Sequence, residues 1–265
     1  MELRKKEKYA IIVLMFVFII KASGFAGAQD LIVNCNDDES NSETFFEDGK
    51  TASRIRIALN GGWSYRTAKI NKKVPEHLVS HMKELRNGYN MGISAAYYFS
   101  EKIGTGILFN YFNSKNETYF KIPTMTEITN MSVRDNISIY FIGQTFGTRL
   151  LNRNKQNGFV LNFGLGYLGF YDKGQLHTQK IILKNGTLGA TWDVGYDIGL
   201  SDNFALGIRA AYIAGFLTSY KSSNGIITQR VKLEKEDYEN LSTINISVGL
   251  RFNLGKTQVS ISRQE

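Results

Sequence analysis

The sequence predicts an all-β fold: a closed, eight-stranded, antiparallel, up-and-down transmembrane β-barrel. Eight segments alternate between apolar and polar residues, which is the pattern of a strand with two different faces. Most are 11–16 residues long, whereas strands of soluble proteins usually have about 5–6 residues and tilted membrane-spanning strands about 9–11. The segments are 54–66, 88–100, 103–114, 134–151, 158–171, 187–200, 204–219 and 241–254.

The connections between these segments alternate in length. Three are short turns, near 101, 152–157 and 202, and four are expected to be long loops, at 67–87, 115–133, 172–186 and 220–240. Short turns at one end and long loops at the other are typical of outer-membrane barrels, with the turns in the periplasm and the loops outside the cell. An even strand count then places both termini on the periplasmic side.

Composition excludes several other classes of protein. The 265 residues are 43% hydrophobic and 12% aromatic, with 25 Gly, 2 Pro and 1 Cys. Disordered chains carry too few apolar residues to match this, and a single cysteine excludes a disulfide scaffold. One long apolar run exists, at the N-terminus, which excludes a helical protein with several membrane spans.

The N-terminal residues 1–28 read as a cleaved signal peptide. A basic stretch at 4–8 precedes an unbroken apolar run of 11 residues, Ala10 to Ile20, and Ala26-Gly27-Ala28 fits an A-x-A cleavage site. An uncleaved anchor helix is the alternative, but Lys21 interrupts the run early. Cleavage removes five basic and two acidic residues, so the net charge falls from +8 to +5. We therefore expect no nucleic-acid partner.

The remaining chain divides into three parts. Residues 29–53 are polar and acidic without a useful period, which predicts a flexible periplasmic arm. Residues 54–254 form the transmembrane barrel, and 255–265 form a C-terminal tail.

The apolar faces of the strands are expected to point outward into lipid. The last segment is the clearest case, because its even positions from Ile244 to Leu254 are apolar and its odd positions are polar or glycine. Segment 134–151 is ambiguous, since the run Ile139 to Ile142 is apolar at every position and permits a bulge.

Aromatic residues gather near the ends of the expected strands, as they do at the two interfaces of a membrane. Ordinary core aromatics of a soluble sandwich are the alternative interpretation. The predicted aromatic girdles consist of Trp63, Tyr65, Tyr111, Tyr171, Phe216 and Tyr220 at the long-loop end, and Phe99, Phe159, Phe204 and Phe252 at the short-turn end.

The opposite faces of the strands carry polar residues and glycines, and five of these residues are charged. Strands 6, 7, 8 and 1 are neighbours in a closed ring, so their inward charges should converge in the periplasmic half of the lumen. Buried charges are tolerated when they are paired. We expect a salt-bridged network that blocks water flow, with a proton or ion path as the alternative. Its members are Arg56, Asp193, Asp197, Arg209 and Arg251.

With these features, residues 54–254 resemble the small bacterial outer-membrane β-barrel proteins, in plan the OmpX-like and OmpA-transmembrane-domain-like groups. The closing stretch from Ser247 to Leu254 is similar to the polar-x-Gly-x-x-Φ-x-Φ signal with which such barrels end. The resemblance implies that Ser247, Gly249, Phe252 and Leu254 form a signal for the barrel-assembly machinery. The chain departs from many relatives in the 11 residues that follow Leu254.

Candidate chemistry is sparse. His77 and His81 lie four residues apart in segment 75–85, which predicts a short helix with both imidazoles on one side. A metal site there would lack an HExxH motif, and Cys35 lies across the membrane, so we expect no metal and no cofactor. The simpler interpretation is an amphipathic helix that packs Leu78, Met82 and Leu85 on the barrel rim.

The leading hypothesis is a non-enzymatic outer-membrane barrel with a plugged lumen and surface loops for interaction or envelope integrity. A narrow channel or lateral port for small or hydrophobic molecules is the first alternative. A lipid-modifying or proteolytic barrel enzyme is the second, although no GxSxG or similar motif supports it. Expected partners are outer-membrane lipid, lipopolysaccharide and the assembly machinery, and the sequence names no protein partner.

Overall fold

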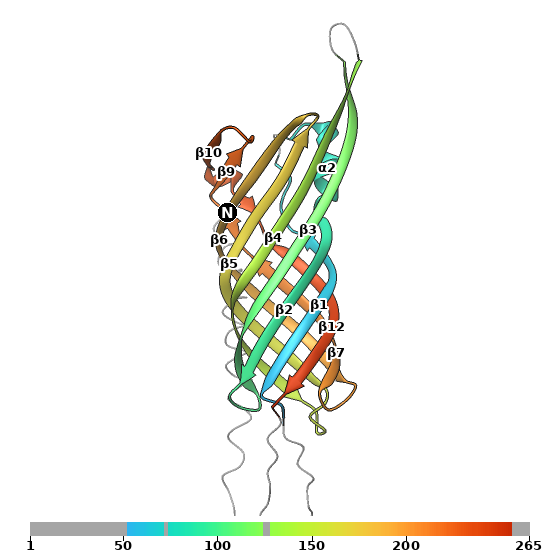
Figure 1. Ribbon diagram of the computed structural model, residues 1–265, viewed down its shortest axis with the longest axis vertical. Coiled ribbons are helices and arrows are strands. Elements are labelled where there is room, and N and C mark those ends of the chain that lie inside the picture. Colours follow the sequence, from blue (N-terminus) through green and yellow to red (C-terminus); the bar gives the residue numbers. More distant parts are fainter. Residues whose placement is uncertain (1–51, 72–73, 124–127, 256–265) are drawn as a thin grey trace, which may run out of the picture. The chain divides into compact units, whose positions relative to one another are not determined.

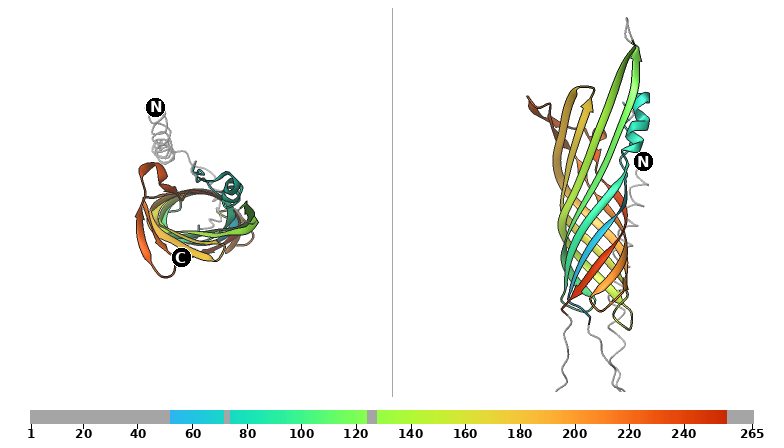
Figure 2. Two further views of the ribbon diagram at one scale, coloured as in Figure 1. Left: turned by 90° about the horizontal axis from the view of Figure 1, so that it is seen from above. Right: turned by 45° about the vertical axis from the view of Figure 1, so that its right-hand side comes forward.

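The computed structural model describes residues 52–71, 74–123 and 128–255. Eight antiparallel strands follow one another around a ring in the order β1, β2, β3, β4, β5, β6, β7 and β12, and β12 pairs with β1 to close it (Figures 1 and 2). The predicted eight-stranded up-and-down barrel is confirmed. The ring strands are β1 (Ile55–Arg66), β2 (Asn87–Tyr98), β3 (Ile103–Pro123), β4 (Ile128–Leu151), β5 (Gly158–Leu176), β6 (Gln179–Gly199), β7 (Phe204–Ala214) and β12 (Thr243–Leu254).

Three predicted segments fall largely on residues that the structure does not describe. The signal peptide 1–28, the arm 29–53 up to residue 51, and the tail beyond Gly255 lie outside the described residues. Within the described ranges, no helix has the length and apolar character needed to cross a membrane.

Alternation along the strands separates an inner from an outer face. On β12, Ile246 and Val248 are more than half exposed, whereas Asn245 and Ser247 between them are buried. The first and last strands are in register from Ile55 opposite Leu254 to Arg66 opposite Thr243. Both ends of the barrel chain therefore lie at the end that carries the short turns 99–102, 152–157 and 200–203, here called the short-turn end.

Strands β3 to β6 are longer than predicted, and the loops expected at 115–133 and 172–186 are wrong. The β3–β4 ladder continues to Pro123 opposite Ile128, and the β5–β6 ladder to Leu176 opposite Gln179. Figure 2 shows β3 and β4 rising beyond the other strands. Beyond the membrane band both faces of a strand can meet polar surroundings, so the period-two signal disappears although the ladder continues.

The segment predicted as strand 204–219 is wrong at its far end. β7 stops at Ala214, and at Gly215 a Cβ atom would lie 2.5 Å from Leu168 Cδ2, so Gly215 lies against the leucine side chain. The chain then forms β8 (Phe216–Leu217), which pairs with β11 (Glu239–Asn240). It continues into a hairpin of β9 (Ser219–Ser223) and β10 (Thr228–Lys232), in which β9 also pairs with β6, and then into the short helix η1 (Lys235–Asp237).

The helix predicted after Pro75 is present as α2 (Glu76–Glu84). It contacts β3, and Figure 1 shows it beside the upper part of that strand. Leu85 at its end is buried and Met82 packs on the same apolar cluster, as the amphipathic interpretation predicts. Leu78, the third residue of that prediction, is partly buried and does not belong to the cluster.

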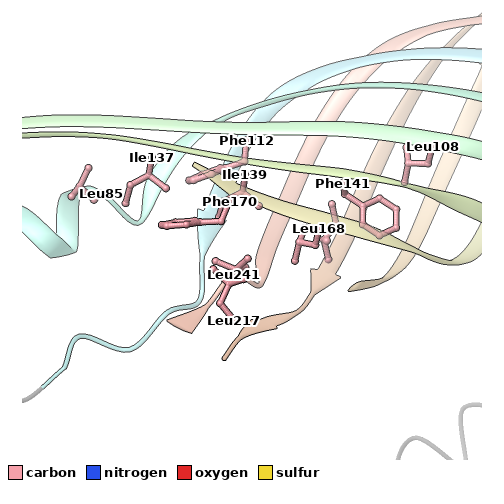
Figure 3. Close-up of a cluster of buried hydrophobic side chains, with 11 residues drawn as sticks. Leu85, Leu108, Phe112, Ile137, Ile139, Phe141, Leu168, Phe170, Leu217 and Leu241 are labelled. Atoms are coloured by element: carbon pink, nitrogen blue, oxygen red, sulfur yellow. The ribbon is translucent and has the colours of Figure 1, made fainter. Parts of the chain in front are cut away.

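The apolar cluster occupies the long-loop half of the barrel interior (Figure 3). Sequence reasoning assigned apolar side chains to the outer face, and for this half of the lumen that assignment is wrong. Leu85 after α2, Leu217 on β8 and Leu241 after β11 pack against the inward apolar side chains of the strands. The buried members are Leu85, Leu108, Phe112, Ile137, Ile139, Phe141, Leu168, Phe170, Ile213, Leu217 and Leu241.

The phase of β4 is settled by this cluster. Ile137, Ile139 and Phe141 point inward and are at most 5% exposed, whereas Ile142 is 48% exposed. The register with β3 is continuous from Ile128 to Thr148, so no bulge interrupts β4 there. The apolar run arises because inner and outer faces are both apolar at this height.

Candidate functional site: the barrel lumen

The short-turn half of the lumen contains a three-residue ion cluster. Arg56 on β1 donates from Nε to Asp197 Oδ2 at 2.7 Å and from Nη2 to Oδ1 at 3.0 Å. Arg251 on β12 donates from Nε to the same Oδ1 at 3.0 Å. Opposite Asp197 on β7 stands Gly207, where a Cβ would lie 2.5 Å from both Arg251 Nε and Asp197 Oδ1. The glycine therefore provides the space that the cluster occupies.

A second ion pair lies four residues further along β6. Arg209 on β7 donates from Nη2 to Asp193 Oδ2 at 2.9 Å, and both side chains are at most 7% exposed. Asn162 on β5 donates to Asp193 Oδ1 at 2.7 Å. All five charged residues predicted for the lumen thus point inward and are bonded in two groups, one around each aspartate. Their effect on water flow stays a prediction.

Arg149 and Tyr98 extend this polar region toward the short turns. The Arg149 guanidinium lies 3.7 Å from the centre of the Tyr98 ring, a cation–π contact. Arg149 also donates to the carbonyls of Glu101 and Ser53, at 2.8 and 2.6 Å. Sequence reasoning missed Arg149 because the phase of its strand was ambiguous. The inward position of Tyr98 could have been predicted, since its neighbour Phe99 was assigned to the outer girdle.

The space left between these side chains is small. A cavity of about 20 Å³ is lined by Arg56, Arg251, Asn60 and the Asp193–Arg209 pair, among others, which is room for about one water molecule. The amide of Asn60 and Nη1 of Arg209 are buried without a protein partner among the described residues, and both residues line this cavity.

Above the apolar cluster, His81 fastens α2 to the barrel wall. The side chain is fully buried; its Nδ1 lies 2.8 Å from Thr118 Oγ1 on β3 and its Nε2 lies 2.9 Å from Asp135 Oδ2 on β4. His77 lies instead against Phe120, with ring centres 4.8 Å apart. The two imidazoles therefore have separate partners, and no group of three metal-ligating side chains occurs in the described ranges.

A further ion pair closes the opposite side of the mouth. Arg66, at the end of β1, pairs with Glu239 on β11 and donates to the Asn240 carbonyl at 3.2 Å. Its guanidinium lies 5.8 Å from the centre of the Phe170 ring in the apolar cluster. This contact anchors β11, and with it the covering segment β8, to the first strand.

The predicted girdle residues lie on the outer wall with two exceptions, Phe216 on β8 and Tyr220 on β9. Trp63, Phe99, Phe159, Phe204 and Phe216 are 48–61% exposed. Tyr65, Tyr111 and Tyr171 are partly buried, and Phe252 packs on Phe204 with ring centres 5.1 Å apart. Tyr220 was expected at the end of a ring strand, but it lies on β9, outside the eight-stranded ring.

The closing residues of β12 have structural roles in the barrel. Ser247 is buried in the lumen and Leu254 is 45% exposed on the outer wall. Gly249 faces β1 so closely that a Cβ atom would collide with the Leu59 carbonyl oxygen. Their use as an assembly signal stays a prediction.

Comparison with known proteins establishes the class of fold. A major outer membrane protein of Thermus thermophilus superposes with a TM-score of 0.51 at 8% identity, covering 77% of this chain and all of that one. OprG of Pseudomonas aeruginosa gives a TM-score of 0.49 at 13% identity, covering 77% and 98%. No family model and no curated protein sequence matches. The resemblance to small outer-membrane β-barrel proteins is thus confirmed at the level of the fold.

Proposed function

We propose that this protein is an integral outer-membrane β-barrel that neither conducts nor catalyses, and that its long-loop end carries its interactions. The observation that carries this proposal is that side chains fill both halves of the lumen. Paired charges occupy the short-turn half, and the apolar cluster occupies the long-loop half. Between the charges only about 20 Å³ is open.

The outer wall supports placement in a membrane. Every ring strand carries outward apolar side chains that are 39–63% exposed, for example Ile55, Met91, Ile107, Leu165 and Ile208. A continuous apolar surface of this kind would be unstable in water, and closure of the ring leaves no strand edge in lipid. Export through the signal peptide and periplasmic termini form part of the proposal.

The absence of catalysis is supported by the state of the one buried histidine. His81 is engaged by Thr118 and Asp135 and is closed to solvent, whereas a catalytic base must reach a substrate proton. A lipid-modifying activity would be detected on labelled lipid A and would disappear in His81→Ala. That result would overturn this part of the proposal.

The partners proposed are lipopolysaccharide and outer-membrane lipid along the wall, and the barrel-assembly machinery during biogenesis. Three measurements test the proposal as a whole. The protein should sediment with the outer membrane, shift its gel mobility on boiling, and show no stable unitary steps in planar bilayers. Steps in the wild type that increase in Asp197→Ala would contradict the plug.

A lateral port for hydrophobic molecules is the second candidate, and an interruption in the wall favours it. β6 pairs with β7 only as far as Ala190 opposite Ala214, and with β9 only from Lys184 opposite Lys221. The apolar cluster lies directly behind this stretch, because Leu168 is in contact distance of a Cβ at Gly189 or Gly215. Faster uptake of an apolar dye, lost in Thr187→Trp but kept in the matched Thr105→Trp, would favour the port over the plug.

A further inference from the structure

Three basic residues lie directly opposite one another on neighbouring strands at the long-loop end. Lys184 on β6 is the register partner of Lys221 on β9, and Lys221 is the register partner of Arg230 on β10. All three side chains are exposed. We call these three residues the basic ladder.

The basic ladder is unfavourable without an anion. Directly opposite side chains in a sheet have Cβ atoms about 4.5–5.5 Å apart, and like charges at this spacing destabilise the pair. No carboxylate of the described residues lies within 4.0 Å of these cations; the side-chain partner that Arg230 has is Ser219 Oγ, at 3.2 and 3.4 Å. Two more exposed cations, Lys173 and Lys232, lie on the adjoining strands β5 and β10.

The ladder lies where the apolar outer wall ends. On β6 the exposed outward apolar series ends at Leu188, which is 85% exposed. Lys184 lies four residues earlier in the chain, about 13 Å further along the strand toward the long-loop end. Tyr171 on β5 is the register partner of Lys184. The ammonium group of Lys173 lies 5.3 Å from the centre of the Tyr171 ring. A tyrosine beside lysines is typical of the membrane interface, where lipid headgroups lie.

We propose that the basic ladder binds the phosphate groups of an anionic lipid headgroup in the leaflet that faces the long loops. Phosphate oxygens accept charge-assisted hydrogen bonds from ammonium and guanidinium groups and cancel the repulsion between the three cations. The inference rests on the proposed membrane placement and adds the ligand class and its site.

The test uses the full barrel in nanodiscs and bisphosphorylated lipid A as the probe, with bound lipid counted by native mass spectrometry. The ladder variant combines Lys184→Gln, Lys221→Gln and Arg230→Gln. The matched control removes three exposed cations at the short-turn end, by Arg54→Gln, Lys102→Gln and Arg153→Gln. With about 1 kcal/mol for each cation near a charged headgroup, binding should weaken about 100-fold in the ladder variant and remain unchanged in the control.

Three outcomes would overturn the inference: equal binding by the ladder variant, equal binding of dephosphorylated lipid A, or displacement of the lipid by an equal concentration of inorganic phosphate. Retention of the heat-dependent gel shift shows that the variants are folded. Lys221→Gln alone should also weaken the binding of lipid A, by less than the triple variant does. If the protein did not sediment with the outer membrane, the proposed function would fail independently of these binding results.

Discussion

Arg56 and Asp197 form a bidentate ion pair across the lumen, with bonds of 2.7 and 3.0 Å between the first and the sixth ring strands. These strands are not neighbours, because β12 and β7 stand between them in the ring. Asp197 also accepts a bond from Arg251, so one carboxylate is the direct ion-pair partner of two buried guanidinium groups. The barrel therefore depends more on Asp197 than on either arginine.

Replacing Asp197 by Asn keeps the shape of the side chain and removes its charge. Arg56 and Arg251 would then be buried without a counter-charge, and loss of one partner of a buried pair costs about 3–5 kcal/mol. We expect the urea concentration at the midpoint of unfolding to fall by the amount that corresponds to this loss. The gel shift measures the folded fraction at each urea concentration. Glu117→Gln is the control, because its pair with Arg134 is exposed and should contribute little. Equal losses in both variants would contradict the structural importance of the cluster.

Gly249→Ala should impair formation of the folded barrel. The added methyl group meets the Leu59 carbonyl oxygen, and backbone on the facing strand must move to admit it. Gly61→Ala is matched in chemistry and sits on the facing strand, but its nearest neighbour, the Asn90 carbonyl oxygen, is 4.0 Å away. The yield of heat-modifiable protein in the membrane should fall for Gly249→Ala alone. Similar yields would show that the β1–β12 contact is more adaptable than this geometry indicates.

Phe112→Ala should destabilise the barrel by about 3–5 kcal/mol, because it leaves a cavity in the apolar cluster. Phe109→Ala on the same strand is the comparison, since Phe109 is 39% exposed on the outer wall and lipid chains can fill the space. Unfolding midpoints in the same lipid would measure the difference. Equal effects would indicate that the lumen is loosely packed.

His81→Leu should release α2 from the barrel wall. It removes the bonds to Thr118 and Asp135 and leaves the Asp135 carboxylate without its histidine partner, which costs about 1–3 kcal/mol locally. Hydrogen exchange of residues 76–84 should accelerate, while exchange in β12 stays slow. His77→Leu is the matched control, because His77 is exposed and contacts only Phe120 among the aromatic rings of the described chain. Unchanged exchange in His81→Leu would show that the remaining contacts hold the helix, namely the packing of Met82 and Leu85 and the bond from Asn116 to the His81 carbonyl.

Alternation along single strands was sufficient to determine much of this protein. The regular pattern from Ile244 to Leu254 predicted both faces of β12, and the inward charges on β1, β6, β7 and β12 were located from strand phase and ring order alone. This works because each such residue differs sharply from its neighbours in polarity, and the period of a strand assigns neighbours to opposite faces.

Tertiary structure decided the features for which that contrast is absent. The inward phase of Ile137 and Ile139, the extension of β3 to β6, and the burial of His81 all occur where both faces of an element have similar polarity or where a distant segment supplies the cover. Alternation along a strand reports the difference in polarity between its two faces. It carries no information on whether lipid, water or another segment of the chain contacts each face. The two ion groups of the polar half were therefore determined by the sequence, whereas Arg149 and the apolar half were decided by tertiary packing.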